Sequence, residues 1–156
     1  MTSSGPALPR AARRVQEALH ELGVDAGVVV LEDSARTAAE AAAAVGVEQG
    51  AIVKSLVFRA VDGGEPVLVL VSGDNRCDEA LLGVARADAA AVREVTGYAI
   101  GGVPPVGHPA PLHTIVDEQL GRFPVVWAAA GTPHAVFPIA FEELLRVTGA
   151  DPRRVS

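Results

Sequence analysis

One lysine, Lys54, is the first candidate for chemistry, because twelve arginines supply all the other Lys and Arg charges of this 156-residue chain. It lies within the apolar run AIVKSLVF at residues 51–58. Lysine is seldom buried without a partner, since taking an ammonium out of water is costly. One interpretation is a strand lysine whose stem follows apolar surface while its ammonium reaches solvent. The other, which we favour, is a compact positive charge directed into a cleft.

A glycine- and proline-rich segment is the second candidate. Residues 96–108 read TGYAIGGVPPVGH and contain the adjacent pair Gly101 and Gly102. Adjacent glycines let backbone N–H groups approach a ligand, and the prolines restrict the loop to one shape. Such a loop can bind a carbonyl oxygen or a carboxylate without any catalytic side chain. A tight structural connection explains the same spacing equally well.

A small-residue turn and an aspartate complete the set of candidates. Residues 127–134 read WAAAGTPH, so an apolar strand ends in a turn that contains Gly131 and Thr132. Small side chains there either leave room for a ligand or let two backbones pack closely. Asp117 ends another apolar run and is either a partner for the lysine or the cap of a short helix at residues 118–121.

Common catalytic signatures are missing. The chain has no Gly-x-Ser-x-Gly elbow, no Walker A loop and no Gly-x-Gly-x-x-Gly after a strand. Among four histidines only His108 and His113 are close in sequence, and the intervening prolines keep them off a common helix face. Acidic neighbours disfavour a thiolate at Cys77, which we interpret as a partly buried helix residue. We therefore expect neither a metal site nor a cofactor.

Composition bounds the class of protein. The length favours one domain with a substantial core. A net charge of −6 argues against broad binding to nucleic-acid backbone, DNA included, but not against holding one nucleic-acid end in a pocket. The single cysteine, the lack of a signal peptide and the lack of a membrane-spanning apolar run predict a cytoplasmic protein with no membrane partner.

The elements that must position these residues are a mixture of helices and strands without a steady βαβ rhythm. We expect helices at 10–22, 37–46, about 74–87, 88–95 and 140–147, strands at 27–31, 52–58, 66–71, 113–117, 125–129 and 135–139, and a constrained loop at 96–111. This pattern predicts an α+β fold with a mixed, largely antiparallel sheet and flanking helices. The expected organisation is a flexible tail at 1–9, a single domain at 10–150 and a C-terminal tail at 151–156.

Strand alternation sharpens the interpretation of Lys54. In an extended strand it shares one face with Ile52 and Leu56, while Val53 and Ser55 point to the other face. Both faces are mostly apolar, so the strand is expected to be central and covered on both sides. Such a strand gives a lysine little surface along which to reach solvent.

In combination these segments carry a resemblance. The chain resembles the YbaK-type family of free-standing and prolyl-tRNA-synthetase-associated editing domains, over about residues 28–147. The matching segments, in the family's order, are IVKSL at 52–56, TGYAIGGVPPVG at 96–107, TIVD at 114–117 and AAG at 129–131. The resemblance implies a YbaK-like editing domain with a pocket that hydrolyses misacylated tRNA at the ester between the amino acid and the terminal ribose.

The resemblance also implies roles for individual residues. Lys54 stands at the family's functional lysine, and Gly101, Gly102 and Pro105 match its substrate-positioning loop. Pocket positions are matched by Asp117 and Gly131, and we place Thr132 with them as substrate-binding; His108 and His134 receive no role. The implied partners are the acceptor end of an aminoacyl-tRNA and, as a further expectation, an aminoacyl-tRNA synthetase.

An aminoacyl ester is already activated, so a site can cleave it by orientation and charge stabilisation without its own nucleophile. We expect Lys54 to contact the terminal phosphate or the ester region, and N–H groups near Gly101 and Gly102 to hold the carbonyl or orient water. Burial favours the neutral lysine, whereas a phosphate or Asp117 favours the ammonium, which we expect to be the working form.

Two other functions stay open from the sequence alone. One is a non-catalytic module that binds a small molecule or a synthetase partner, which the acidic net charge favours. The other is a general hydrolase of small esters. Arginines at 10, 13 and 14 would form a basic patch with those at 153 and 154 only if the chain ends meet; a solvated helix face explains them otherwise.

Overall fold

The computed structural model describes residues 8–156, so residues 1–7 of the predicted N-terminal tail lie outside the described residues. The helices are α1 (Arg10–Glu21), α2 (Ala38–Val45), α3 (Glu79–Leu82), α4 (Ala89–Thr96) and α5 (Phe141–Thr148), with 3-10 helices η1 (Gln49–Ala51) and η2 (Glu118–Arg122). The strands are β1 (Val29–Val30), β2 (Val53–Ala60), β3 (Pro66–Ser72), β4 (Val84–Arg86), β5 (His113–Asp117), β6 (Val125–Ala129), β7 (Ala135–Ala140) and β8 (Pro152–Arg153).

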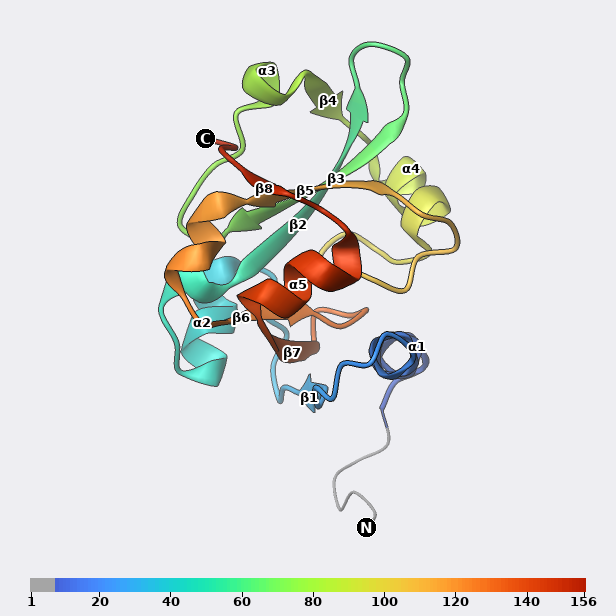
Figure 1. The fold of residues 1–156 in the computed structure, drawn as a ribbon. Coiled ribbons are helices and arrows are strands. Elements are labelled where there is room, and N and C mark those ends of the chain that lie inside the picture. Colours follow the sequence, from blue (N-terminus) through green and yellow to red (C-terminus); the bar gives the residue numbers. More distant parts are fainter. Residues whose placement is uncertain (1–7) are drawn as a thin grey trace.

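The strands form two sheets (Figure 1). A five-stranded sheet has the order β4-β2-β3-β5-β8 and is mixed, since β3 and β8 run parallel to β5 while β2 runs antiparallel to β3 and β4. A three-stranded antiparallel sheet has the order β1-β7-β6. A single parallel bridge between Ile52 and Trp127 joins them. The predicted α+β class, with mixed and antiparallel pairing and flanking helices, is confirmed.

The β2–β3 hairpin is the centre of the larger sheet and forms as the sequence predicts. Two apolar runs flank a turn in which Gly63 and Gly64 have positive φ, a conformation that side chains disfavour. The register pairs Lys54 with Val71 and Phe58 with Val67. The lysine is therefore held at a defined place on a strand whose partner is almost wholly buried.

The main core lies where α1, α5 and the two sheets meet. The amphipathic face of α1 buries Ala12, Val15 and Leu19, as its 3.6-residue spacing predicts. Leu70 from β3 and Phe137 from β7 belong to the same cluster. Packing from both sheets into one cluster fixes β6 and β7 relative to β2, and this relation positions the site described below.

The predicted helix at about 74–87 is wrong. Asp78, rather than Asp74 or Asn75, caps a single helical turn by accepting from Leu81 N at 3.0 Å. Gly83, with φ of 68°, ends that turn, and the next residues pair with β2 as β4. Cys77 consequently lies in a connection ahead of α3 and not in a helix.

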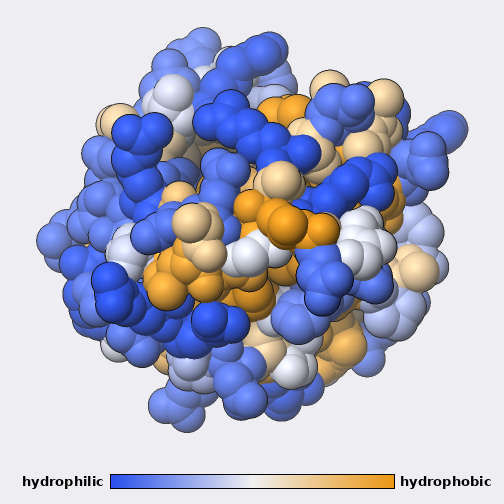
Figure 2. All heavy atoms as spheres, turned by 90° about the horizontal axis from the view of Figure 1, so that it is seen from above, coloured by the Kyte–Doolittle hydropathy of each residue, from blue (hydrophilic) through white to orange (hydrophobic). Residues whose placement is uncertain are grey.

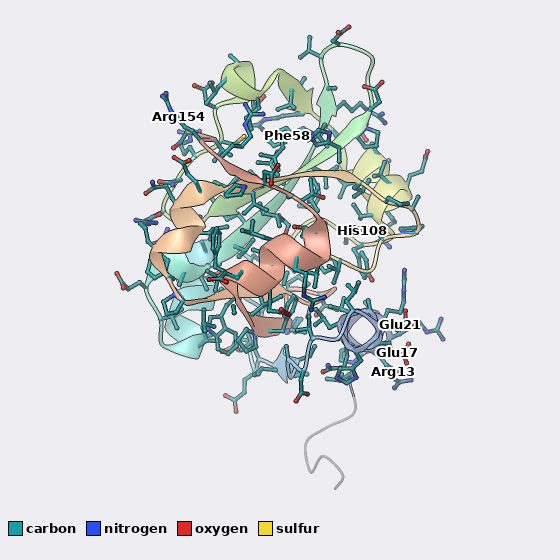
Figure 3. All side chains as sticks on the ribbon, in the orientation of Figure 1. Arg13, Glu17, Glu21, Phe58, His108 and Arg154 are labelled. Atoms are coloured by element: carbon teal, nitrogen blue, oxygen red, sulfur yellow. The ribbon has the colours of Figure 1, made fainter. Side chains whose placement is uncertain are left out.

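The C-terminal residues 151–156 are also not a free tail. Pro152 and Arg153 form β8, which pairs with β5, and Val155 is fully buried. This edge strand lies far from α1, as the positions of Arg13 and Arg154 make plain (Figure 3). The arginines near the two ends therefore do not form a common basic patch.

Candidate functional site

A cavity of about 440 Å³ opens between α2, β2, the β6–β7 pair and the loop that begins at Ile100. Three of the residues singled out from the sequence, Lys54, Gly101 and Thr132, line it together. Most of the wall is apolar and small, including Ala38, Ala41, Ala128, Ala129 and Val136. Among the described residues that line it there is no aspartate, glutamate, histidine or cysteine.

A gap in the strand pairing explains why an interior strand is accessible at Lys54. On the side away from β3, the strand is bridged to β6 only at Ile52 and is paired with β4 only from Phe58 onward. Within the described residues, positions 53–57 have β3 as their single partner strand. The expectation of a strand closed off from solvent is thus corrected: its faces are packed, but its edge opens into the cavity, and residues 54–56 are half-buried.

The ammonium of Lys54 is anchored from the segment that follows β3. Its Nζ donates to the backbone oxygen of Asn75, whose side-chain Nδ2 donates to Oδ2 of Asp117 at 3.0 Å. Asp117 is fully buried and also accepts from Ser72 N at 3.0 Å and Gln119 N at 2.9 Å. It therefore caps η2, which is one of the two roles that the sequence left open. It reaches the lysine through Asn75 and not as a direct ion pair.

Burial holds the pKa of Lys54 below the ordinary lysine value, and the neighbouring Arg76 guanidinium acts in the same direction. The carboxylates of Asp74 and Asp117 oppose both effects without cancelling them. An anion bound beside Nζ would favour the ammonium and raise this pKa. The surroundings of Lys54 are thus arranged to gain from a negatively charged ligand.

Gly102 is where the glycine loop touches the β6–β7 turn. A Cβ at this position would lie 2.7 Å from the Gly131 oxygen and 2.7 Å from the Thr132 Cα, so only glycine fits without displacement. Its N–H donates to the Ala99 oxygen at 3.0 Å, which removes it from the N–H groups expected to face a substrate. The neighbouring Gly101, with φ of 94°, is exposed, and its N–H has no acceptor among the described residues.

The remaining predicted residues lie behind or away from this cavity. Gly131, also at φ of 94°, packs against α1, because an added Cβ would meet the Ala11 backbone at 2.8 Å. Pro105 is buried and lines a different cavity of about 300 Å³, beside α5. His108 lines that same cavity, with its Nε2 2.8 Å from the Pro104 oxygen. Burial lowers the pKa of His108, and Lys54 is not among the residues that line this cavity.

Several lining residues were not anticipated from the sequence. Arg36 and Thr37 at the start of α2 and Gln49 in η1 contribute polar groups to the wall. The capping box of Thr37 and Glu40 is evident in the sequence and is present, but it identifies only a helix start. Trp127 closes one side, and the Ser55 Oγ is buried without a hydrogen-bond partner among the described residues.

In the described part of the chain no three His, Cys, Asp or Glu side chains are grouped so that they could hold a metal ion. No helix among residues 8–156 is long and apolar enough to cross a membrane.

Comparison with known proteins agrees with this arrangement. Residues 32–147 match the family described as the aminoacyl-tRNA editing domain. The uncharacterized protein YwhH of Bacillus subtilis (strain 168) is 31% identical over 123 residues, which are 75% of this chain and 78% of YwhH.

Solved structures extend the likeness to nearly the whole chain. One, proposed as a trans-editing enzyme for prolyl-tRNA synthetase, is 50% identical with a TM-score of 0.89 over 96% of this chain and 99% of its own. Another, the hypothetical protein APE2540, is 34% identical with a TM-score of 0.82 over 91% and 98%. The chain belongs to the aminoacyl-tRNA editing domain family, the YbaK/ProX group.

Proposed function

We propose that this protein is an aminoacyl-tRNA deacylase that hydrolyses the ester between a mischarged amino acid and the terminal ribose of tRNA. The observation that carries the proposal is the position of Lys54. The one lysine of the chain lies at a break in the sheet, on the wall of an apolar cavity, in a chain of the editing-domain family. The proposal places the protein in the cytoplasm, acting on tRNA released from a synthetase.

The cavity suits a reaction that needs no protein nucleophile. An aminoacyl ester is activated, so holding it beside a water molecule and stabilising the charge on its carbonyl oxygen accelerate cleavage. The Lys54 ammonium supplies a positive charge, and Gly101, which lines the same cavity, supplies a backbone N–H donor. Within the described residues no Asp, Glu, His or Cys side chain lines the cavity, so this wall supplies no general base of those types to the water.

The apolar part of the cavity is the proposed place for the amino-acid side chain. Alanines from α2 and β6 contribute to that surface, and Trp127 lines it as well. A charged side chain would lose its hydration there without gaining a partner. We therefore expect uncharged amino acids to be removed in preference to Asp, Glu, Lys or Arg.

The experiment is a deacylation assay with a panel of misacylated tRNAs and, in parallel, free aminoacyl esters. Much faster release of amino acid from tRNA than from free esters supports editing, and comparable release from both supports a general esterase. No turnover with either substrate, together with tight binding, supports a non-catalytic module, which the net charge of −6 favours. Lys54→Ala should abolish the turnover; a variant with full activity would remove Lys54 from the reaction.

A further inference from the structure

A second cavity, of about 350 Å³, adjoins the first on the other side of Lys54. The two share the open edge of β2, at residues 54–56, and the loop side chains Ile100 and Val103. The second cavity extends toward α3, β4 and α4, on the face where apolar side chains gather within a hydrophilic rim (Figure 2). Neither the expected ester chemistry nor the amino-acid pocket uses this space.

The charge of the second cavity is opposite to that of the whole chain. Lys54, Arg76 and Arg86 line it, against one carboxylate, Glu79. The chain as a whole has a net charge of −6. A concentration of cations in one recess of an acidic protein attracts an anion locally without making the surface broadly attractive to nucleic acid.

These cations are poorly neutralised by the protein itself. Within the described residues Arg76 has no ion pair and no side-chain hydrogen bond, and Arg86 reaches Glu79 at 3.7 Å with 84% of its side chain exposed. Arg76 also contributes to the lowered pKa of Lys54, so the two positive charges repel each other. A bound anion would relieve that repulsion.

We propose that the second cavity binds the phosphodiester preceding the terminal nucleoside of an RNA 3′ end, with Arg76 and Arg86 as its binding residues. This inference rests on the proposed function, because the aminoacyl group must then lie in the first cavity. Lys54, at the junction, lies between the phosphate and the ester. Ile100, 60% exposed at the same junction, offers an apolar surface to a base.

The arrangement explains how an acidic protein selects a nucleic-acid substrate. Only one or two phosphates need contact the protein, so affinity falls modestly with salt rather than steeply. Discrimination between a tRNA-linked ester and a free ester then comes from the second cavity. Discrimination between amino acids comes from the first.

The kinetic test compares the double variant Arg76→Ala/Arg86→Ala with wild type on aminoacyl-tRNA and on an aminoacyl-adenosine ester that lacks a 5′ phosphate. We expect the double variant to raise KM for aminoacyl-tRNA about tenfold and to make this KM less dependent on salt concentration. KM for the nucleoside ester should change much less. The matched control is Arg13→Ala, which makes the same substitution on an exposed face of α1 (Figure 3). Equal losses on both substrates, or none on tRNA, would overturn the inference.

A binding test separates this inference from the deacylase proposal. The probes are the trinucleotide CCA and adenosine, titrated into the intact protein at low salt. Wild type should bind CCA more tightly than adenosine, the double variant should lose that difference, and Glu79→Gln should bind CCA more tightly than wild type because the competing carboxylate is gone. If CCA is preferred but no aminoacyl-tRNA is hydrolysed, the deacylase proposal is refuted and the phosphate site is retained. If aminoacyl-tRNA is hydrolysed and CCA is not preferred, the deacylase proposal is retained and the phosphate site is refuted.

Discussion

Gly102→Ala tests the contact that joins the glycine loop to the β6–β7 turn. The new Cβ would lie 2.7 Å from the Gly131 oxygen and the Thr132 Cα, whereas ordinary contact begins at 3.4 Å. Loop and turn must therefore separate by about 0.7 Å (3.4 − 2.7). Both obstructing atoms belong to backbone, so no side-chain rotation relieves the clash. Because both segments line the cavity, the shift moves Gly101 relative to Lys54.

The expected magnitudes follow from that displacement. Overpacking of a filled interior costs about 1–3 kcal/mol of unfolding free energy. At about 2–4 °C per kcal/mol for a chain of this size, the melting temperature should fall by about 2–12 °C. A misplacement approaching 1 Å in a site that works by orientation lowers turnover by up to about 100-fold.

Thermal and urea unfolding measure the first effect, and turnover of aminoacyl-tRNA measures the second. Gly27→Ala is the matched control, because it adds the same methyl group where no atom lies within 4 Å. It should change stability by less than about 1 kcal/mol, in the stabilising direction. An unchanged melting temperature for Gly102→Ala would refute the close packing; a lower melting temperature with full turnover would refute the positioning role of the loop.

Five other outcomes are expected. Lys54→Ala should lower turnover at least about 100-fold, with little loss of stability because the side chain is half-buried. Lys54→Arg should also lack turnover, because a guanidinium does not replace the ammonium. Full activity in either variant would contradict this expectation. Because kcat/KM reports the free protein, it should fall as pH rises through the lowered pKa of Lys54, and a kcat/KM profile flat to about pH 10 would contradict the assignment. Between that lowered pKa and about pH 10.4, Lys54 binds fewer protons in the folded state than in the unfolded state, so the stability of wild type should rise with pH. Urea unfolding measures this rise, and Lys54→Ala should lack it. Asp117→Ala leaves the buried Ser72 N–H without its acceptor and removes the acceptor of two partly buried donors, Asn75 Nδ2 and Gln119 N; it should cost about 2–4 kcal/mol by urea unfolding, and wild-type stability would refute its structural role. Deleting residues 152–156, which removes β8 and the buried Val155, should cost about 2 kcal/mol or more, whereas a dispensable tail would cost nothing.

The β2–β3 hairpin was predictable because its signals are local. Two apolar runs of strand length flank a pair of glycines, and the glycines adopt the positive φ that such a turn needs. The capping box that begins α2 is similarly contained within four residues, and both of its hydrogen bonds form. Local chemistry of this kind does not depend on which other segments pack nearby.

The helix expected near Asp74 was not predictable, because its candidate caps are used by distant residues. Asp74 pairs with Arg122 at 3.0 Å and accepts from the Ser72 hydroxyl at 2.9 Å. Asn75 donates to Asp117, which is 42 positions away in sequence. With both side chains engaged in the tertiary structure, the helix begins only after Asp78.

The residues that line the candidate cavity were predictable only in part. Lys54, Gly101 and Thr132 line one cavity, as their types suggested. Pro105 and Asp117 belong to the matched segments at 96–107 and 114–117, but Pro105 lines the cavity beside α5 and Asp117 is fully buried. A loop and a strand end present successive residues in different directions. The packing of α2 against Ile52 and Trp127, which sequence does not reveal, brings its first turn into the wall.

The number and direction of its hydrogen-bond donors explain why position 54 is a lysine rather than an arginine. An ammonium has three donors, and one of them is taken by the Asn75 oxygen. Two donors remain, on a compact group at the junction of the two cavities, and they can point in different directions. A guanidinium would present its donors in one rigid plane and fill the junction. The gap in β2 pairing thus requires a small cation with divergent donors, which is the one property that distinguishes lysine from the twelve arginines.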